Sequence, residues 1–165
     1  MDKSNNISYS ALQLRCEPIE CVRIGFVGLG VRAQRAVHRM MHIEGCKVVA
    51  LCDLVDENIN DAVGIITEYK HTTPAAFTGQ EGWKQLCEQP DVDLVYICTD
   101  WASHAEIAVY AMQQGKHVAT EVPAATTVHP SMCIMRCTAR FARTPSPTKP
   151  ILTHSIGSHR SCRAL

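Results

Sequence analysis

Short apolar runs alternate with amphipathic stretches between residues 22 and 121. The apolar runs at residues 22–27, 47–52, 93–98 and 117–120 carry apolar side chains on both faces, so each indicates a fully buried strand. Apolar residues at helical spacing indicate helices over residues 31–41, 56–69, 81–89 and 104–114. Strands that are buried on both faces need helices on both sides of a parallel sheet. The pattern therefore predicts an α/β domain with a doubly wound parallel sheet.

Two glycines directly follow the first predicted strand, and a predicted helix begins behind them. Ligands of such sheets bind beyond the carboxyl ends of the strands, which is where Gly28 and Gly30 lie. Gly28 permits a tight turn, and Gly30 lets the backbone approach a pyrophosphate. The free N–H groups and the positive dipole end of the helix then face the phosphates. Ala33 replaces the usual third glycine and is small enough for close helix–strand packing.

Asp53 ends the second predicted strand, about 20 residues beyond the glycine turn. A carboxylate at this place can accept hydrogen bonds from both ribose hydroxyls of an adenosine and would repel a 2′-phosphate, which favours NAD over NADP. Arg32 weakens this preference, because a guanidinium can pair with phosphate. Asp53 could instead only cap the helix that follows it. Strand, glycine turn, helix, strand and acid in one unit together predict dinucleotide binding.

Residues 99–104 follow the clearest strand of the chain and are expected to line the same crevice. Trp101 could stack on a ring of the ligand, and His104 could donate a hydrogen bond to the nicotinamide or its ribose. Alternatively, Trp101 packs on the sheet edge and His104 begins a helix near solvent. The residues by themselves leave both interpretations open.

Four segments resemble, in order and spacing, the N-terminal NAD-binding domain of the Gfo/Idh/MocA oxidoreductase family: VRIGFVGLG, VVALCD, DVDLVYICTDWASH and GKHVATEVPAA. Two longer segments are most similar to one branch, the NAD-dependent α-N-acetylgalactosaminidases of glycoside hydrolase family 109: EGWKQLCEQPDVDLVYI and IAVYAMQQGKHVATEVPAATT. The resemblance covers about residues 22–128 and implies a Rossmann-like dinucleotide-binding domain there, after an N-terminal extension at residues 1–21.

The resemblance implies NAD as the cofactor. Together with the residues derived above, the expected NAD-binding residues are Gly28, Gly30, Val31, Arg32, Asp53, Thr99, Trp101, Ala102, Ser103, His104, Glu121 and Val122. Most dehydrogenases of the wider family carry a lysine after that glutamate, which serves proton transfer near the substrate. Val122 stands at this place, which disfavours a simple sugar-alcohol dehydrogenase and agrees with the glycosidase branch.

The glycosidase branch implies a redox-neutral reaction. The sugar is oxidised at C3 by hydride transfer to NAD⁺, loses its C2 proton, eliminates the glycosidic oxygen, adds water and is reduced again. In the family most substrate-binding groups come from a second domain, which we expect this chain to lack. We therefore expect an inactive fragment that binds NAD, carries no catalytic residue and meets carbohydrate only in a full-length form. A sugar dehydrogenase fragment and a non-enzymatic nucleotide-binding module are the alternatives.

The charges are unevenly distributed. Sixteen Lys and Arg balance sixteen Asp and Glu, which argues against binding nucleic acid or an anionic membrane through bulk charge. Residues 122–165 nevertheless hold six basic residues and no acid. The family would continue there with an acidic helix and a strand that brings an asparagine to the cofactor, near Pro150. We therefore expect residues 129–165 to be a frameshifted, truncated or disordered tail; a basic arm for acidic partners is the alternative. A further hypothesis is that the fragment does not fold stably, because the sheet would be open on the side where the sixth strand should lie.

Metal and export signals are weak. The nine cysteines are odd in number and irregularly spaced, so no disulfide framework is expected. Cys133 and Cys137 lack a second ligand pair besides His129, and His38 and His42 lack the glutamate of a zinc-peptidase helix, so no metal site is predicted. Residues 1–21 lack a secretory signal and no apolar run approaches about 20 residues, which predicts a cytoplasmic chain without a membrane span; an oligomer is left open.

Overall fold

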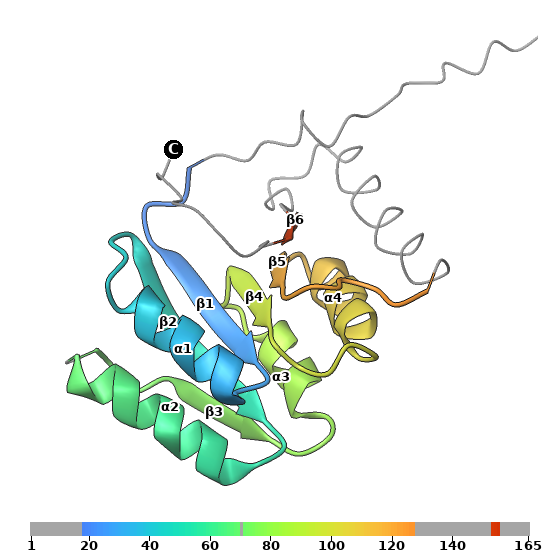
Figure 1. Ribbon diagram of the computed structural model, residues 1–165. Coiled ribbons are helices and arrows are strands. Elements are labelled where there is room, and N and C mark those ends of the chain that lie inside the picture. The colour runs from blue at the N-terminus through green and yellow to red at the C-terminus, as the bar shows by residue number, and fades with distance from the viewer. Residues whose placement is uncertain (1–17, 70, 128–152, 156–165) are drawn as a thin grey trace, which may run out of the picture.

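A single parallel sheet forms the centre of the computed structural model, which describes residues 18–69, 71–127 and 153–155 (Figure 1). In spatial order the strands run β3-β2-β1-β4-β5-β6. Their bounds are β1 Val22–Val27, β2 Cys46–Asp53, β3 Ala75–Thr78, β4 Leu94–Ile97, β5 His117–Thr120 and β6 Thr153–Ser155. The helices are α1 Val31–Met40, α2 Asp56–Glu68, α3 Gly82–Glu88 and α4 His104–Gln113. The predicted doubly wound α/β fold is confirmed.

Helices cover both faces of the sheet, as its apolar strands require. Helices α1 and α2 lie on one face, and α3 and α4 lie on the other (Figure 1). Successive residues of β4 alternate between the two apolar clusters, since Val95 and Ile97 belong to the α3/α4 side and Tyr96 to the α1/α2 side. Each fully buried large apolar side chain contributes about 1.5–3 kcal/mol to stability. The sheet is therefore held rigidly from both sides.

Every strand and helix predicted from the sequence is present, with its ends within one residue of the expectation. Strand β3 was not predicted, because Ala75–Thr78 is short and mostly exposed and lacks the apolar character of the central strands. The expected open edge beyond β5 is wrong at residues 118–120, which pair in parallel with β6. The other residues of the predicted tail, including His129, Cys133 and Cys137, lie outside the described residues.

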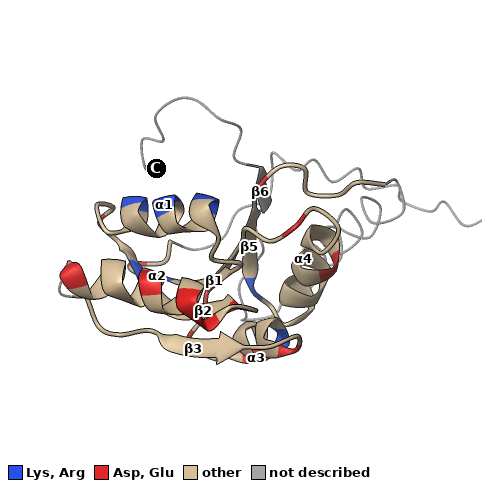
Figure 2. Cartoon of the chain, turned by 60° about the horizontal axis from the view of Figure 1, so that its bottom comes forward, with Lys and Arg blue, Asp and Glu red and all other residues tan. Residues whose placement is uncertain are grey.

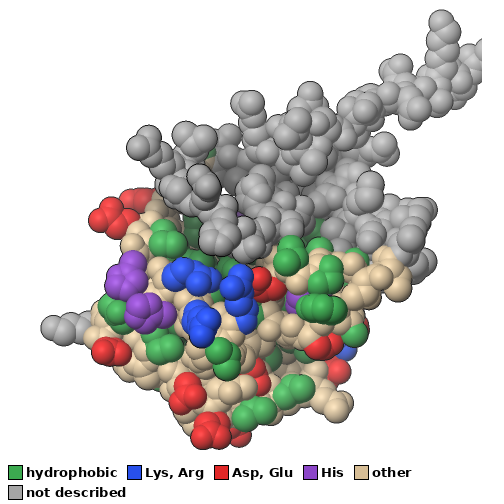
Figure 3. Space-filling model, viewed as in Figure 1, with side chains coloured by type: hydrophobic (Ala, Val, Ile, Leu, Met, Phe, Trp, Pro, Cys, Tyr) green, Lys and Arg blue, Asp and Glu red, His purple; other side chains and the backbone are tan. Residues whose placement is uncertain are grey.

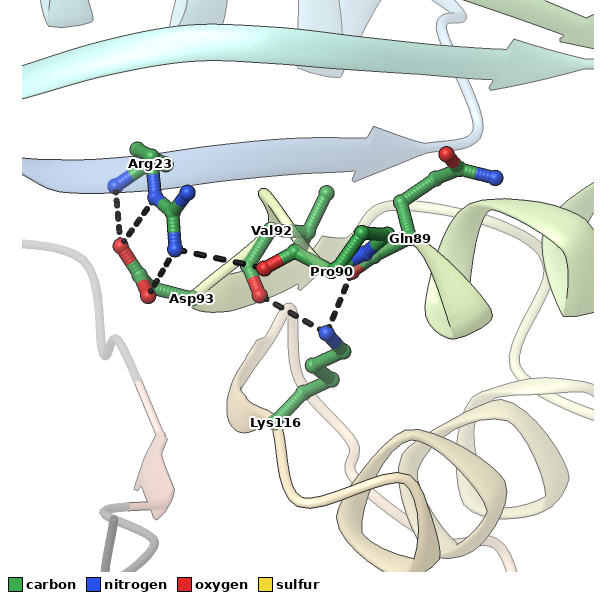
Figure 4. Close-up of polar contacts among 6 residues, drawn as sticks. All are labelled: Arg23, Gln89, Pro90, Val92, Asp93 and Lys116. Atoms are coloured by element: carbon green, nitrogen blue, oxygen red, sulfur yellow. Dashed lines mark hydrogen bonds and ion pairs between the residues drawn. The ribbon is translucent and has the colours of Figure 1, made fainter. Parts of the chain in front are cut away.

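The amino ends of β1, β4 and β5 are joined by buried charges (Figure 4). The Asp93 carboxylate is 2% exposed and accepts hydrogen bonds from the Arg23 side chain at 2.9 and 3.0 Å and from the Arg23 backbone N–H at 3.1 Å. Lys116 Nζ donates to the carbonyl oxygens of Gln89 and Val92 at 2.5 and 3.0 Å. These bonds fix the turn before β4 against both neighbouring strands, at the edge opposite the strands' carboxyl ends.

We expect Asp93→Ala to lower the free energy of unfolding by about 1–3 kcal/mol, because three hydrogen bonds to a buried carboxylate are lost. The cost stays below that of a fully buried ion pair, since 37% of the Arg23 side chain is exposed to water. Urea denaturation measures the change. Lys84→Ala is the control: it breaks an exposed ion pair with Glu81 and is expected to change stability much less. Equal effects of both substitutions would contradict the assigned role of Asp93.

Candidate functional site

The turn after β1 runs against the backbone of its neighbouring strands. The Gly28 N–H donates to the Cys52 carbonyl at 2.8 Å, and Gly28 has a φ of +84°. A Cβ at this position would lie 2.8 Å from the carbonyl group of Cys98 and from the N atom of Thr99. Neither this φ nor this space suits an L side chain. Gly28 thus permits the tight turn that the sequence predicts.

Gly30 differs from Gly28, because nothing within the protein excludes a side chain there. Its φ is −62°, and a Cβ would meet no atom within 4 Å. Gly30 precedes α1, whose N-terminus has no side-chain cap and no acid in its first turn. Ala33 is fully buried, as predicted for close packing of the helix. Open space therefore lies in front of backbone N–H groups that favour an anion.

Exposed apolar side chains gather at the carboxyl ends of the strands. Among the described residues, five of the six large exposed ones lie within four residues after the end of β1, β2, β4 or β5: Val31 (74% exposed), Leu54 (70%), Val55 (50%), Trp101 (64%) and Val122 (49%). Such a group is typical of a ligand-binding edge. Trp101 is thus free to stack on a ligand, and its alternative packing on the sheet edge is not observed.

Asp53 links the glycine turn to α2. Its Oδ2 accepts the Leu29 N–H at 2.5 Å, and its Oδ1 accepts the Val55 N–H at 2.9 Å and the Asn58 side-chain amide at 3.2 Å. Asp53 therefore bonds to the start of the following helix, as the alternative interpretation of the sequence proposed. It does more than this, because it also binds the glycine turn. Because a carboxylate offers about four lone-pair sites, ribose hydroxyls can share it with these donors.

Gln34 and Asn58 extend this contact, and the sequence analysis missed both. The Gln34 side-chain amide donates to the carbonyl oxygens of Leu29 and Asn58 at 3.0 and 2.7 Å. Gln34 thus joins the glycine turn to α2 a second time. A polar residue one position after Ala33 on α1 is the signal that could have indicated it.

Arg32 and Glu121 form an ion pair between α1 and the end of β5. Arg32 Nε and Nη2 donate to the two carboxylate oxygens of Glu121 at 3.0 and 3.1 Å, and this hydrogen bonding raises the pKa of Arg32. The Tyr96 hydroxyl donates to Glu121 Oε1 at 3.2 Å. Burial raises the pKa of the nearby Cys98 thiol to about 12, so Cys98 is no nucleophile at neutral pH.

The loop after β4 is held by its own side chains. Asp100 accepts the N–H groups of Ala102 and Ser103 at 3.1 and 3.3 Å and the Ser103 hydroxyl at 2.8 Å; the bond from that hydroxyl is the main reason that the pKa of Asp100 is lowered. The same hydroxyl lies 2.8 Å from the Thr99 hydroxyl. The residues predicted to line the crevice here thus form an ordered loop, with Asp100 as the acceptor that the sequence analysis missed.

His104 begins α4 but is fully buried, so the alternative that placed it near solvent is wrong. Its Nδ1 lies 2.9 Å from the Pro123 carbonyl oxygen and its Nε2 lies 3.0 Å from the Thr99 carbonyl oxygen. The ring therefore ties the loop after β4 to the loop after β5. Both ring nitrogens face these carbonyl oxygens, so direct hydrogen bonding to a cofactor, which stays a prediction, would require one contact to be exchanged.

The part of the chain that the structure describes contains no group of three or more His, Cys, Asp or Glu residues that could hold a metal ion. His38 lies on α1 and His42 lies two residues beyond its end, and both rings pack against that of Tyr69. Figure 3 shows histidine side chains next to the basic ones. Helix α1 carries basic residues, and the neighbouring helix α2 carries acidic ones (Figure 2).

The five described cysteines carry free thiols. None of the described helices is long and apolar enough to cross a membrane.

The glycine turn, the uncapped helix and the acid at the end of β2 define a dinucleotide-binding Rossmann domain. A family model described as oxidoreductase family, NAD-binding Rossmann fold, matches residues 22–141. The chain belongs to this family, Gfo/Idh/MocA. The resemblance stated from the sequence is thereby confirmed.

Relatives and solved structures agree with this assignment. The chain is 51% identical over 118 residues to glycosyl hydrolase family 109 protein 1 of Phocaeicola vulgatus, covering 71% of this chain and 25% of the relative. It is 47% identical over 117 residues to an α-N-acetylgalactosaminidase of Bacteroides fragilis, covering 71% and 28%. The fold matches a Lactobacillus casei myo-inositol dehydrogenase in complex with NAD(H) and myo-inositol, with 22% identity, a TM-score of 0.64 and coverage of 81% and 36%. The chain spans about a quarter of the length of the relatives.

We expect Gly28→Ala and Gly30→Ala to affect stability very differently. Gly28→Ala forces a side chain against backbone at positive φ, so it should lower the free energy of unfolding by more than about 2 kcal/mol. Gly30→Ala meets no atom and should change it by less than about 1 kcal/mol. Chemical denaturation of both variants measures the difference. A destabilised Gly30→Ala variant would show that Gly30 serves the fold instead of a ligand.

Proposed function

We propose that residues 22–127 bind NAD along the carboxyl ends of β1, β2, β4 and β5. The observation that carries this proposal is the open space in front of Gly30, at an uncapped helix N-terminus and next to the Asp53 carboxylate. Gly30 and the first turn of α1 would hold the diphosphate through backbone N–H groups. Asp53 would accept the ribose hydroxyls of the adenosine. NAD, when bound, supplies a reversible acceptor of hydride.

The arrangement of charges supports NAD over NADP. The Asp53 carboxylate would repel a 2′-phosphate at the ribose that it binds. From the sequence, Arg32 could have bound a 2′-phosphate and so weakened the preference for NAD. In the structure its side chain is paired with Glu121, directly after β5. Since β5 and β2 lie on opposite sides of β1, the guanidinium is directed away from Asp53. No competing phosphate contact from Arg32 is therefore expected.

For a longer protein that carries this domain, we propose NAD-dependent glycosidase activity of the α-N-acetylgalactosaminidase kind. This proposal is supported by relatives of family 109 at about half identity, one of which is named α-N-acetylgalactosaminidase. Val122 stands where most dehydrogenases of the family carry the proton-transferring lysine, which supports the glycosidase over a sugar dehydrogenase. A sugar dehydrogenase is the second candidate, favoured by the structural similarity to myo-inositol dehydrogenase.

We expect Asp53→Ala to weaken NAD⁺ binding about tenfold or more, since hydrogen bonds to a charged group are lost. Isothermal titration calorimetry of the folded chain measures the affinity. NADP⁺ should bind more weakly than NAD⁺ to the unchanged chain, and Asp53→Ala should narrow this gap because the repulsion is removed. Asp61→Ala, an exposed acid on α2, is the control and should leave both affinities unchanged.

Absence of heat with NAD⁺ on a cooperatively folded chain would refute the proposed binding. An Asp53→Ala variant that binds NAD⁺ as tightly as the unchanged chain would refute the role of Asp53. Because Asp53 also bonds to the turn and to α2, the thermal midpoint of each variant must be measured beside its affinity.

The chain of 165 residues is expected to bind NAD⁺ without hydrolysing an aryl α-N-acetylgalactosaminide, since it spans about a quarter of the length of its relatives. Release of the aryl group measures this activity, and robust turnover would contradict the expectation. In a longer protein with this domain, net accumulation of NADH from a free sugar would favour the dehydrogenase over the redox-neutral glycosidase.

A further inference from the structure

Glu121 is bound from two sides by groups of different strands and helices. Arg32 of α1 donates to both of its carboxylate oxygens, and Tyr96 of β4 donates to Oε1. The Glu121 side chain is only 12% exposed, whereas that of Arg32 is 53% exposed. A carboxylate that is mostly removed from water needs such donors. The direction of this carboxylate therefore depends on both neighbours.

Tyr96 is the rigid member of this group. Its residue is 2% exposed, and its ring stacks on that of Phe26 with centroids 4.9 Å apart and an interplanar angle of 17°. Burial, followed by the nearby thiol and carboxylate, raises the pKa of its hydroxyl. The hydroxyl thus remains a donor throughout the neutral range. Arg32, by contrast, lies on the first turn of α1, where a cation is unfavourable near the helix dipole unless it is paired.

The order of the strands assigns this group to one half of the ligand. Asp53 ends β2, on one side of β1, while Tyr96 and Glu121 lie on β4 and directly after β5, on the other side. A dinucleotide whose diphosphate lies at the turn after β1 and whose adenosine lies at Asp53 must extend its second nucleoside toward β4 and β5.

We infer that Tyr96 is a positioning residue for the nicotinamide half of the dinucleotide site. Its hydrogen bond fixes the direction of the Glu121 carboxylate, and through this carboxylate it also fixes the Arg32 guanidinium. This inference rests on the proposed binding of NAD. The adenosine half is held by Asp53 and the glycine turn, so it does not depend on Tyr96. Loss of the Tyr96 hydroxyl therefore weakens a ligand only where that ligand extends beyond the diphosphate.

The test is Tyr96→Phe, which keeps the ring and its stacking on Phe26 and removes the hydroxyl. Calorimetry with NAD⁺ and with ADP compares the whole ligand with its adenosine diphosphate half. The dissociation constant of NAD⁺ is expected to rise about three- to tenfold, as for loss of one hydrogen bond, while that of ADP changes less than about twofold. Comparing the two ligands on one variant cancels any difference in the folded fraction.

A double-mutant cycle tests whether Tyr96 acts through Glu121. In a Glu121→Ala background, Tyr96→Phe is expected to change the ratio of the NAD⁺ and ADP affinities by less than about twofold, because the side chain that it positions is gone. Tyr110→Phe is the matched control. Its hydroxyl also donates to a glutamate, Glu88, but α4 and α3 lie on the other face of the sheet, so both affinities should stay unchanged.

Three outcomes overturn the inference while the proposed function stands. If Tyr96→Phe weakens NAD⁺ and ADP equally, Tyr96 serves the fold in general. If it weakens neither, or if its effect persists in the Glu121→Ala background, it does not position Glu121. Failure of the unchanged, folded chain to bind either ligand refutes the proposed function, and this inference with it.

Discussion

The close approach of the turn after β1 to the end of β4 is the constraint on which the site depends. A Cβ at Gly28 would lie 2.8 Å from backbone atoms of Cys98 and Thr99, so the chain can turn there only without a side chain. This turn directs the N-terminus of α1 toward the carboxyl edge of the sheet. It also brings the Leu29 N–H to Asp53 at 2.5 Å, which joins the turn to β2. Gly30 follows this turn in open space, where a Cβ would meet no atom within 4 Å.

Two carboxylates lie at the carboxyl ends of strands on opposite sides of β1, and each is held without a ligand. Asp53 accepts hydrogen bonds from backbone and side-chain groups of the turn and of the start of α2. Glu121 accepts hydrogen bonds from the side chains of Arg32 and Tyr96. Holding a charged group in place beforehand reduces the entropic cost of binding. The bonds to Glu121 also compensate the removal of its carboxylate, which is 12% exposed, from water. The polar contacts that stabilise the fold here would therefore also prepare it for the dinucleotide that we propose.

The sequence predicted those features that depend on residues close together in the chain. Apolar periodicity located the central strands and the helices. The Gly28–Ala33 spacing with Asp53 predicted the adenosine half of the proposed site, since these residues lie within one strand–helix–strand unit. It could not predict contacts that depend on the order of strands in space. Tyr96 and Glu121 are 25 residues apart, and His104 bonds to Pro123 across 19 residues. Strand β3 was missed because an exposed edge strand has no buried face to set an apolar pattern.

Polar and apolar side chains differ between the two ends of the strands: those at the amino ends stabilise the fold, and those at the carboxyl ends are available for binding. At the amino edge, Asp93 and Lys116 are buried and bonded to protein atoms, so their charges fix β1, β4 and β5 and offer nothing to a ligand. At the carboxyl edge, Val31 and Trp101 leave apolar surface exposed, and Gly30 leaves backbone accessible. Exposed apolar surface costs stability, which rigid packing elsewhere must offset. Because parallel strands place all their carboxyl ends together, one fold can concentrate this cost at a single edge, where a dinucleotide would cover it.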